Sequence, residues 1–160
     1  MPARRPRRTI SSGSPQATTR RREPLESENV LTEKPTVVIA EDNLLIMEGS
    51  LRPLLESEFE IVATAGDGNA AILAAAHYKP AIVLLDVSLP VVRGFDAARK
   101  ILANHPETKI LFVSNYADRA YVEEALQIGA SGYVLKSRIA RELVRAIRTA
   151  LAGDFYRSEI

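Results

Sequence analysis

The chain has 160 residues, close to the usual length of one domain, and 46% of them are apolar, which is enough to build a core. It has no cysteine, which excludes disulfide bonds and thiolate metal sites and suits a cytoplasmic protein. No apolar run approaches the ~20 residues of a membrane span, and the arginine-rich start lacks the apolar stretch of a secretory signal.

The first segment, residues 1–34, differs from the rest of the chain in charge. It holds seven arginines and one lysine against four glutamates, a net charge of +4, whereas the remainder carries −3. Pro, Ser, Thr and Arg dominate it and little of it is apolar, so we expect a disordered tail. Its two arginine clusters have the charge to touch nucleic acid or acidic lipid, but a solvated tail without a partner is the simpler interpretation.

From Pro35 onward, short apolar segments alternate with longer amphipathic ones. The strand-like segments are rich in β-branched and aromatic residues and lie at 36–40, 60–65, 81–86, 109–114 and 132–136. Helices are predicted between and after them, at 43–57, 67–78, 92–104, 117–128 and 139–152. This alternation predicts a parallel sheet with helices on both faces, and right-handed crossovers leave few topologies.

Individual residues mark the predicted helices. Pro53 lies inside the first helix, where it removes a hydrogen bond and should bend the axis. Gly129 ends the fourth helix, at the position where a C-terminal glycine belongs. The fifth helix has an apolar stripe along one face and, on another, a row of arginines: Arg138, Arg141, Arg145 and Arg148. Such a row is usually only solvated, and a role in docking a partner is kept as a hypothesis.

Polar residues follow four of the five predicted strands. Glu41 and Asp42 follow the first strand, Asp86 ends the third, Ser114 ends the fourth and Lys136 ends the fifth, whereas the second is followed only by a glycine-rich turn. The carboxyl ends of parallel strands meet at one edge of a doubly wound sheet, where ligands bind. The sequence therefore predicts that these five side chains share one site.

The residue types in this predicted site favour phosphoryl transfer. Three carboxylates repel one another, so the cluster favours a bound cation, and oxygen ligands without His or Cys suit Mg²⁺. Lys136 would supply a positive charge and Ser114 a hydroxyl to a phosphoryl group. Neutralising a phosphoryl group in transfer is a matter of position and electrostatics, and Asp86 is the predicted nucleophile, which becomes an aspartyl phosphate.

Taken singly, each of these residues has a simpler interpretation. Asp42 is a candidate cap for the first helix, Ser114 or Asp118 for the fourth, and Lys136 is a candidate surface lysine. Their joint occurrence on successive strand ends favours the site.

The chain resembles the receiver domain of two-component response regulators over residues 36 to about 152. The matching motifs are VVIAEDN, GDGNAAI, IVLLDVSLPVVRGFD, ILFVSNYAD and ALQIGASGYVLKS. MEGSLRPLLE in the first helix and LKS at the end of the fifth strand are most similar to the subfamily with a C-terminal helix-turn-helix DNA-binding head. The resemblance implies an α/β, flavodoxin-like fold: a doubly wound sheet of five parallel strands in the order 2-1-3-4-5 with five flanking helices.

The resemblance also implies a phosphoacceptor site that contains Mg²⁺. Asp86 would accept a phosphoryl group from a sensor histidine kinase and would catalyse its own phosphorylation and dephosphorylation, so the chain would not be an enzyme in the ordinary sense. Asp42 and Asp86 would ligate Mg²⁺, Glu41 would do so through water, and the backbone carbonyl of Ser88 would complete the protein ligands. Glu41 stands where Asp is commoner in the family, which is a mild departure.

The same resemblance implies a switch. Ser114 and Lys136 would hold the phosphoryl oxygens after transfer, and Tyr133 would be the aromatic residue that turns inward as Ser114 moves. The face built by the fourth helix, fifth strand and fifth helix would then change. A tyrosine of the core without a switching role is the alternative for Tyr133. Asn115 stands where the family usually has a small residue, so access to Asp86 would be narrower.

The expected domain organisation is a tail at 1–34, a receiver at 35–152 and the start of a linker at 153–160. No helix-turn-helix follows within these 160 residues. We therefore expect no sequence-specific DNA binding by them, since base contacts would come from the missing head. Phosphate storage, homodimer formation or docking to a partner would be the remaining outputs, and transcription regulation is the process that the resemblance implies.

Three rival functions share parts of this pattern. An aspartate-nucleophile phosphatase of the dehalogenase type needs a DxD motif after the first strand, and a flavodoxin-like FMN carrier needs a phosphate loop there; neither is present. A degenerate receiver that binds proteins without phosphorylation is the remaining alternative. The complete acidic set argues against it.

Overall fold

The computed structural model describes residues 33–160, of which Lys34–Ile160 form one compact unit. The tail predicted for residues 1–34 lies outside the described residues except for its last two. Within the described part, no helix combines the length and the apolar character that a membrane crossing needs.

Five strands form where the sequence predicts them, to within one residue at each end. They are β1 (Thr36–Ala40), β2 (Glu60–Ala65), β3 (Ile82–Asp86), β4 (Lys109–Ser114) and β5 (Gly132–Leu135). Their parallel pairing gives the order β2-β1-β3-β4-β5, which confirms the predicted flavodoxin-like topology. A short sixth strand, β6 (Tyr156–Arg157), extends the sheet beyond β5 and was not predicted.

The five predicted helices are also present, to within two residues at each end. The first consists of three consecutive segments, α2 (Leu44–Ile46), the π-helix η1 (Met47–Leu51) and α3 (Arg52–Leu55). The others are α4 (Gly68–Tyr78), α5 (Gly94–Asn104), α6 (Arg119–Ile128) and α7 (Ile139–Leu151), the last preceded by the short 3₁₀ helix η2 (Lys136–Arg138).

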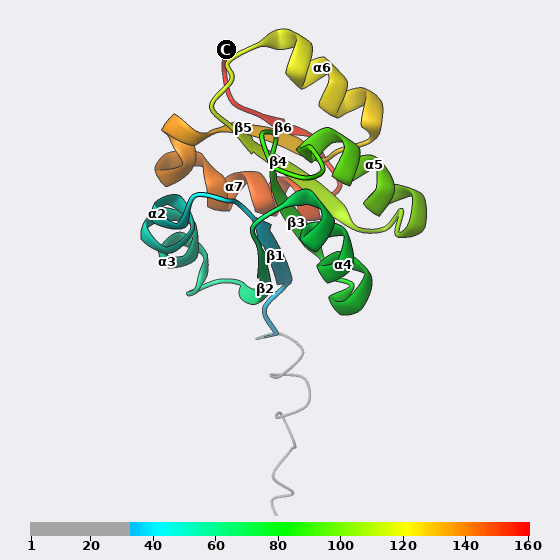
Figure 1. Ribbon diagram of the computed structural model, residues 1–160. Coiled ribbons are helices and arrows are strands. Elements are labelled where there is room, and N and C mark those ends of the chain that lie inside the picture. The colour runs from blue at the N-terminus through cyan, green and yellow to red at the C-terminus, as the bar shows by residue number, and fades with distance from the viewer. Residues whose placement is uncertain (1–32) are drawn as a thin grey trace, which may run out of the picture. The chain divides into compact units, whose positions relative to one another are not determined.

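The sheet lies between two helical layers, with α4, α5 and α6 on one face and α2, α3 and α7 on the other (Figure 1). Successive side chains of a strand point to opposite faces, so each strand contributes to both cores. On β3, Val83 and Leu85 pack in the first core, and Ile82 and Leu84 pack in the second. Burial on both faces explains why this strand is a continuous apolar run in the sequence.

Short polar residues and a glycine fix the helix ends. The cap of the first helix is Asn43, whose Oδ1 accepts a hydrogen bond from the Leu45 N–H at 2.9 Å, so the candidate assignment of Asp42 as this cap is wrong. Asp118 caps α6, as one of the two candidates predicted. Gly129 ends α6 with a positive φ of 94°, which confirms its predicted role.

Pro53, predicted to remove a hydrogen bond and bend the first helix, follows a π-helical segment of that helix. The helix widens just before it, and the Arg52 N–H donates to the carbonyl of Met47, five residues back. Pro53 has no N–H, and its ring would crowd the carbonyl four residues earlier in a regular α-helix. A π-helical turn relieves this conflict while keeping both Met47 and Leu51 buried.

The C-terminal segment folds onto the edge of the sheet rather than leaving it at once. The N–H of Ser158 donates to the carbonyl of Tyr133, and its hydroxyl accepts from the N–H of Leu135 at 3.1 Å. The same hydroxyl donates to Glu142 on α7, and Ser158 is only 2% exposed. The segment predicted as a linker start therefore covers the free edge of β5.

We expect Ser158→Ala to lower the free energy of unfolding by about 1–3 kcal/mol, because it leaves the buried Leu135 N–H and the Glu142 carboxylate each without this partner. Chemical denaturation measures the loss. Ser137→Ala is the matched control, since Ser137 is exposed. Equal stability of the two variants would show that β6 contributes nothing to holding this edge.

Candidate functional site

The sheet register brings the predicted site residues to one edge. Ala40 pairs with Leu85, so Glu41 and Asp86 follow on adjacent strands. Asp86 pairs with Val113, and Ser114 pairs with Leu135. Consequently Ser114 and Lys136 lie one residue further along the neighbouring strands. The register alone thus gathers the groups that the sequence analysis assigned to one site.

Lys136 joins the two buried carboxylates. Its Nζ lies 2.8 Å from Glu41 Oε1 and 2.8 Å from Asp86 Oδ2. The side chains of Glu41 and Asp86 are 1% and 6% exposed, so this ammonium group neutralises charge that water reaches poorly. The other oxygen of Asp86 accepts a hydrogen bond from the Ser88 N–H at 3.0 Å. Both oxygens of Asp86 are therefore held by donors.

Burial and these contacts shift the pKa values of Glu41 and Asp86 in opposite directions. Burial raises the pKa of Glu41 to about 7, and the neighbouring Asp86 adds to the rise. Burial also opposes ionisation of Asp86, but contacts with Glu41, Lys136 and the Ser88 N–H together hold its pKa below the ordinary value. Near neutral pH, Asp86 is the carboxylate kept ionised, which is the form that a nucleophile needs.

The acidic edge has the chemistry of a site for a hard divalent cation. Glu41, Asp42 and Asp86 each offer a carboxylate oxygen, and these atoms lie within 4.8 Å of one another. Asp42 is exposed to solvent, whereas Glu41 and Asp86 are buried. An all-oxygen donor set that is open to water on one side fits Mg²⁺, which keeps several water ligands.

Comparison with known proteins identifies the family. The profile of the response regulator receiver domain matches residues 37–148. The chain belongs to the response regulator receiver family. The acidic edge described above is therefore the acidic pocket of a receiver, of the kind that typically binds Mg²⁺.

Two curated relatives of this receiver are named a transcriptional regulatory protein and an oxygen regulatory protein. Transcriptional regulatory protein DegU of Brevibacillus brevis is 37% identical over 131 residues, covering 81% of this chain and 56% of the relative. Oxygen regulatory protein NreC of Staphylococcus aureus is 38% identical over 122 residues, covering 75% of this chain and 56% of the relative. The chain thus spans about half the length of the curated relatives it matches.

Solved structures show the same fold. A two-component response regulator of the LuxR family from an Aurantimonas species has a TM-score of 0.73 and 31% identity, over 78% of this chain and 89% of that one. The signal receiver domain of NarL from Mycobacterium tuberculosis has a TM-score of 0.70 and 34% identity, over 76% and 98% of the two chains.

The two predicted switch residues of the receiver are joined through the backbone of Tyr116, a connection that the sequence did not indicate. The Tyr116 N–H donates to Ser114 Oγ at 3.0 Å, and its carbonyl accepts from the Tyr133 hydroxyl at 2.6 Å. Tyr133 is already fully buried here, in the inward orientation that the resemblance implies only after Ser114 moves, and burial raises its pKa to about 12. Any movement of Ser114 that shifts Tyr116 would therefore reach Tyr133.

The predicted arginine row, which runs from Arg138 at the end of η2 to Arg148 on α7, is largely engaged within the receiver. Three of its members contact other side chains of the domain: Arg138 contacts Glu142, Arg145 the Tyr156 hydroxyl, and Arg148 Glu58. Among residues 33–160, Arg141 alone of the four has no ion-pair or side-chain hydrogen-bond partner. The docking role of the row remains a prediction, with fewer free charges than the sequence suggested.

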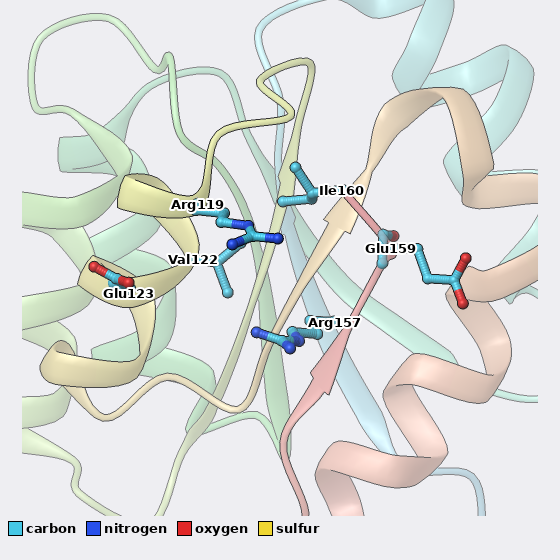
Figure 2. Close-up of a pocket in the computed structure, with 7 residues that line it drawn as sticks. Arg119, Val122, Glu123, Arg157, Glu159 and Ile160 are labelled. Carbon is cyan, nitrogen blue, oxygen red and sulfur yellow. The ribbon is translucent and has the colours of Figure 1, made fainter.

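A hollow of about 490 Å³ lies between α6 and β6, apart from the acidic edge. Figure 2 shows Arg119 and Arg157 directed into it from the two sides, while Glu123 and Glu159 point away. A second hollow of about 500 Å³, between α5 and α6, is lined by Ser88 and Tyr116 and adjoins the acidic edge. The helix α6 therefore has open space on both flanks.

Proposed function

We propose that this receiver takes a phosphoryl group from a histidine kinase onto Asp86 and signals by changing the face built by α6, β5 and α7. The observation that carries the proposal is the environment of Asp86. Its carboxylate is buried, with one oxygen held by the Ser88 N–H and the other by Lys136, and these contacts hold its pKa below the ordinary value. A carboxylate held in this way beside further acidic groups is suited to nucleophilic attack on phosphorus.

In the proposed transfer, a carboxylate oxygen of Asp86 attacks the phosphorus of a phosphohistidine. The P–N bond breaks, its electron pair stays on the imidazole nitrogen, and an acyl phosphate forms on Asp86. Lys136 already lies 2.8 Å from Asp86 Oδ2, so its charge is in place to stabilise the phosphoryl oxygens. Water later hydrolyses the acyl phosphate and returns the free carboxylate and inorganic phosphate.

Mg²⁺ would supply a second positive charge for the phosphoryl oxygens and would be held by Asp42, Asp86, the Ser88 carbonyl and, through water, Glu41. Lys136 is the one cationic side chain within ion-pair distance of these carboxylates among residues 33–160. Its single positive charge offsets one of the two negative charges of Glu41 and Asp86, and Glu41 can take up a proton near neutral pH because its pKa is about 7. The chain thus limits repulsion among its own carboxylates.

The proposed signal begins at Ser114. A new phosphoryl group adds about −1.5 to −2 charges and strong acceptors near its hydroxyl. Ser114 would donate to a phosphoryl oxygen, which competes with its present contact to the Tyr116 N–H. Tyr116 and Tyr133 would move with it, and α6 would follow because it begins shortly after Tyr116.

The name of one curated relative, a transcriptional regulatory protein, supports a role in transcription regulation for a longer protein of this kind. We propose that residues 35–152 act as the receiver and that 153–160 begin the connection to an output domain. Any DNA binding by the longer protein would come from that output domain.

Hydrogen–deuterium exchange with and without acetyl phosphate tests this switch. We expect exchange to change in α6, β5 and α7 of the wild type, beyond the loops that surround Asp86, because Ser114 and Tyr133 connect these elements to the site. Asp86→Asn is the control that should show no such change. A response limited to the loops around Asp86 would rule out the proposed output face.

A further inference from the structure

The glycine-rich turn after β2 has no role in the site predicted from the sequence, yet it touches the loop that follows Asp86. The turn ends at Gly68, the first residue of α4, and Asp67 caps this helix by accepting a hydrogen bond from the Ala70 N–H at 2.7 Å. The N–H of Gly68 donates to the carbonyl of Pro90 at 3.2 Å. The beginning of α4 thus contacts the backbone of the loop at residues 87–93.

No side chain fits at this contact. A Cβ atom on Gly68 would lie 1.9 Å from the carbonyl oxygen and 2.6 Å from the carbonyl carbon of Val92. Both atoms belong to the backbone, so a rotamer change cannot relieve the overlap. Even the smallest side chain would therefore displace the loop or the start of α4.

The loop at residues 87–93 contains a strained turn, which neighbouring residues must stabilise. The N–H of Val92 donates to the same Pro90 carbonyl at 2.8 Å, across Val91, whose φ is +68°. Positive φ is unfavourable for a β-branched residue, and a three-residue turn with this hydrogen bond and a positive φ at its central residue is rare and strained. Such strain persists only where neighbouring structure fixes it. Gly68 is one such neighbour, since it contacts both Pro90 and Val92.

The same loop begins at the acidic site. Ser88, two residues before Pro90, donates its N–H to Asp86 Oδ1, and the Gly94 N–H closes the loop onto the Val87 carbonyl at 3.0 Å. We infer that Gly68 is a positioning residue for the acidic site: its contact with Pro90 and Val92 holds Ser88 in place toward Asp86 and a divalent cation. The inference rests on the proposed function, in which the Ser88 carbonyl is a ligand of Mg²⁺.

Gly68→Ala and Gly66→Ala form a matched pair within one turn. A Cβ on Gly66 would meet nothing within 4 Å, whereas the one on Gly68 meets backbone. Mg²⁺ is titrated into isotope-labelled wild type and both variants, and the amide signals of Asp86 and Ser88 are followed. We expect Gly68→Ala to raise the Mg²⁺ dissociation constant about tenfold, because supporting groups around a metal site typically contribute that much. Gly66→Ala should match the wild type.

The Mg²⁺ dependence of phosphorylation by acetyl phosphate provides the second measurement. If Gly68→Ala misplaces a ligand, the midpoint of this Mg²⁺ dependence moves to a higher Mg²⁺ concentration. If the variant only contains less folded protein, the yield of phosphorylated protein falls and the midpoint stays where it is. If the wild type is phosphorylated and the two variants have equal midpoints, the positioning role of Gly68 is overturned. A wild type that binds Mg²⁺ but takes up no phosphate would instead overturn the proposed function, while the titration still decides on Gly68.

If Gly68→Ala does not fold, amide exchange in the wild type answers the same question. Mg²⁺ should slow exchange of the Gly68 N–H, because an ordered loop holds the Pro90 carbonyl against it. Unchanged exchange at saturating Mg²⁺ would contradict the inference.

Discussion

Asp86→Asn is expected to abolish phosphoryl uptake while leaving the fold intact. The amide has nearly the shape of the carboxylate and can still accept the hydrogen bond from the Ser88 N–H. It cannot attack phosphorus, because it has neither the negative charge nor the basic oxygen of a carboxylate. Incubation with labelled acetyl phosphate and Mg²⁺, followed by counting of the protein-bound label, measures the effect.

Asp154→Asn is the control for this substitution, since Asp154 is exposed near the C-terminal end of α7. It should take up label at the wild-type rate. Labelling of Asp86→Asn at wild-type rate and stoichiometry would mean that another residue is the phosphoacceptor.

Lys136→Met is expected to have the second-largest effect, on both stability and transfer. The substitution leaves Glu41 and Asp86 buried without their shared cation, and breaking a buried pair in this way costs about 3–5 kcal/mol. Phosphoryl uptake should fall on the order of a hundredfold, as when one positioned donor is removed from a transition state. Denaturant unfolding and the rate of labelling measure the two effects.

The loss of stability in Lys136→Met should depend on pH in a known direction. The pKa of Glu41 in the folded wild type is about 7, above its ordinary value of 4.5, so the folded state holds the proton more tightly than the unfolded state. The stability that this tighter proton binding adds to the folded state is fully present below pH 4.5 and is lost as the pH rises from 4.5 through about 7. The variant lacks the ammonium group that favours ionised Glu41, so its metal-free form should be least stable at the alkaline end.

Lys100→Met is the control, because Lys100 is exposed on α5. Mg²⁺ should restore part of the stability of Lys136→Met by supplying the missing positive charge, and should have less effect on Lys100→Met. Equal stabilities of the two variants in metal-free buffer at alkaline pH would refute the role given to Lys136.

The sheet and the acidic edge were predictable because they depend on local patterns. The apolar run before Asp86 marks a strand buried on both faces, and parallel strands bring their carboxyl ends together whatever the loops do. Glu41, Asp86 and Lys136 could therefore be assigned to one site before any contact was known. Their distances confirm that they lie together.

The strand β6, the cap of the first helix and the role of Gly68 could not be predicted, because they depend on contacts or backbone geometry that no local sequence pattern indicates. The strand β6 has two residues and is held by Ser158 against Glu142, which lies 16 residues away in the sequence. Asn43 and Asp42 are both good helix caps, so only the backbone geometry decides between them. The role of Gly68 follows from its approach to Val92, which nothing in the turn itself indicates.

The intact mass of the wild-type protein after incubation with acetyl phosphate tests the central claim most directly. One portion contains Mg²⁺ and the other contains EDTA. We predict that the first gains the mass of a single phosphoryl group, which hydroxylamine removes as it does from an acyl phosphate, and that the second gains nothing. A mass that stays unchanged at saturating Mg²⁺ and acetyl phosphate would contradict the account and favour a receiver that binds its partner without phosphorylation.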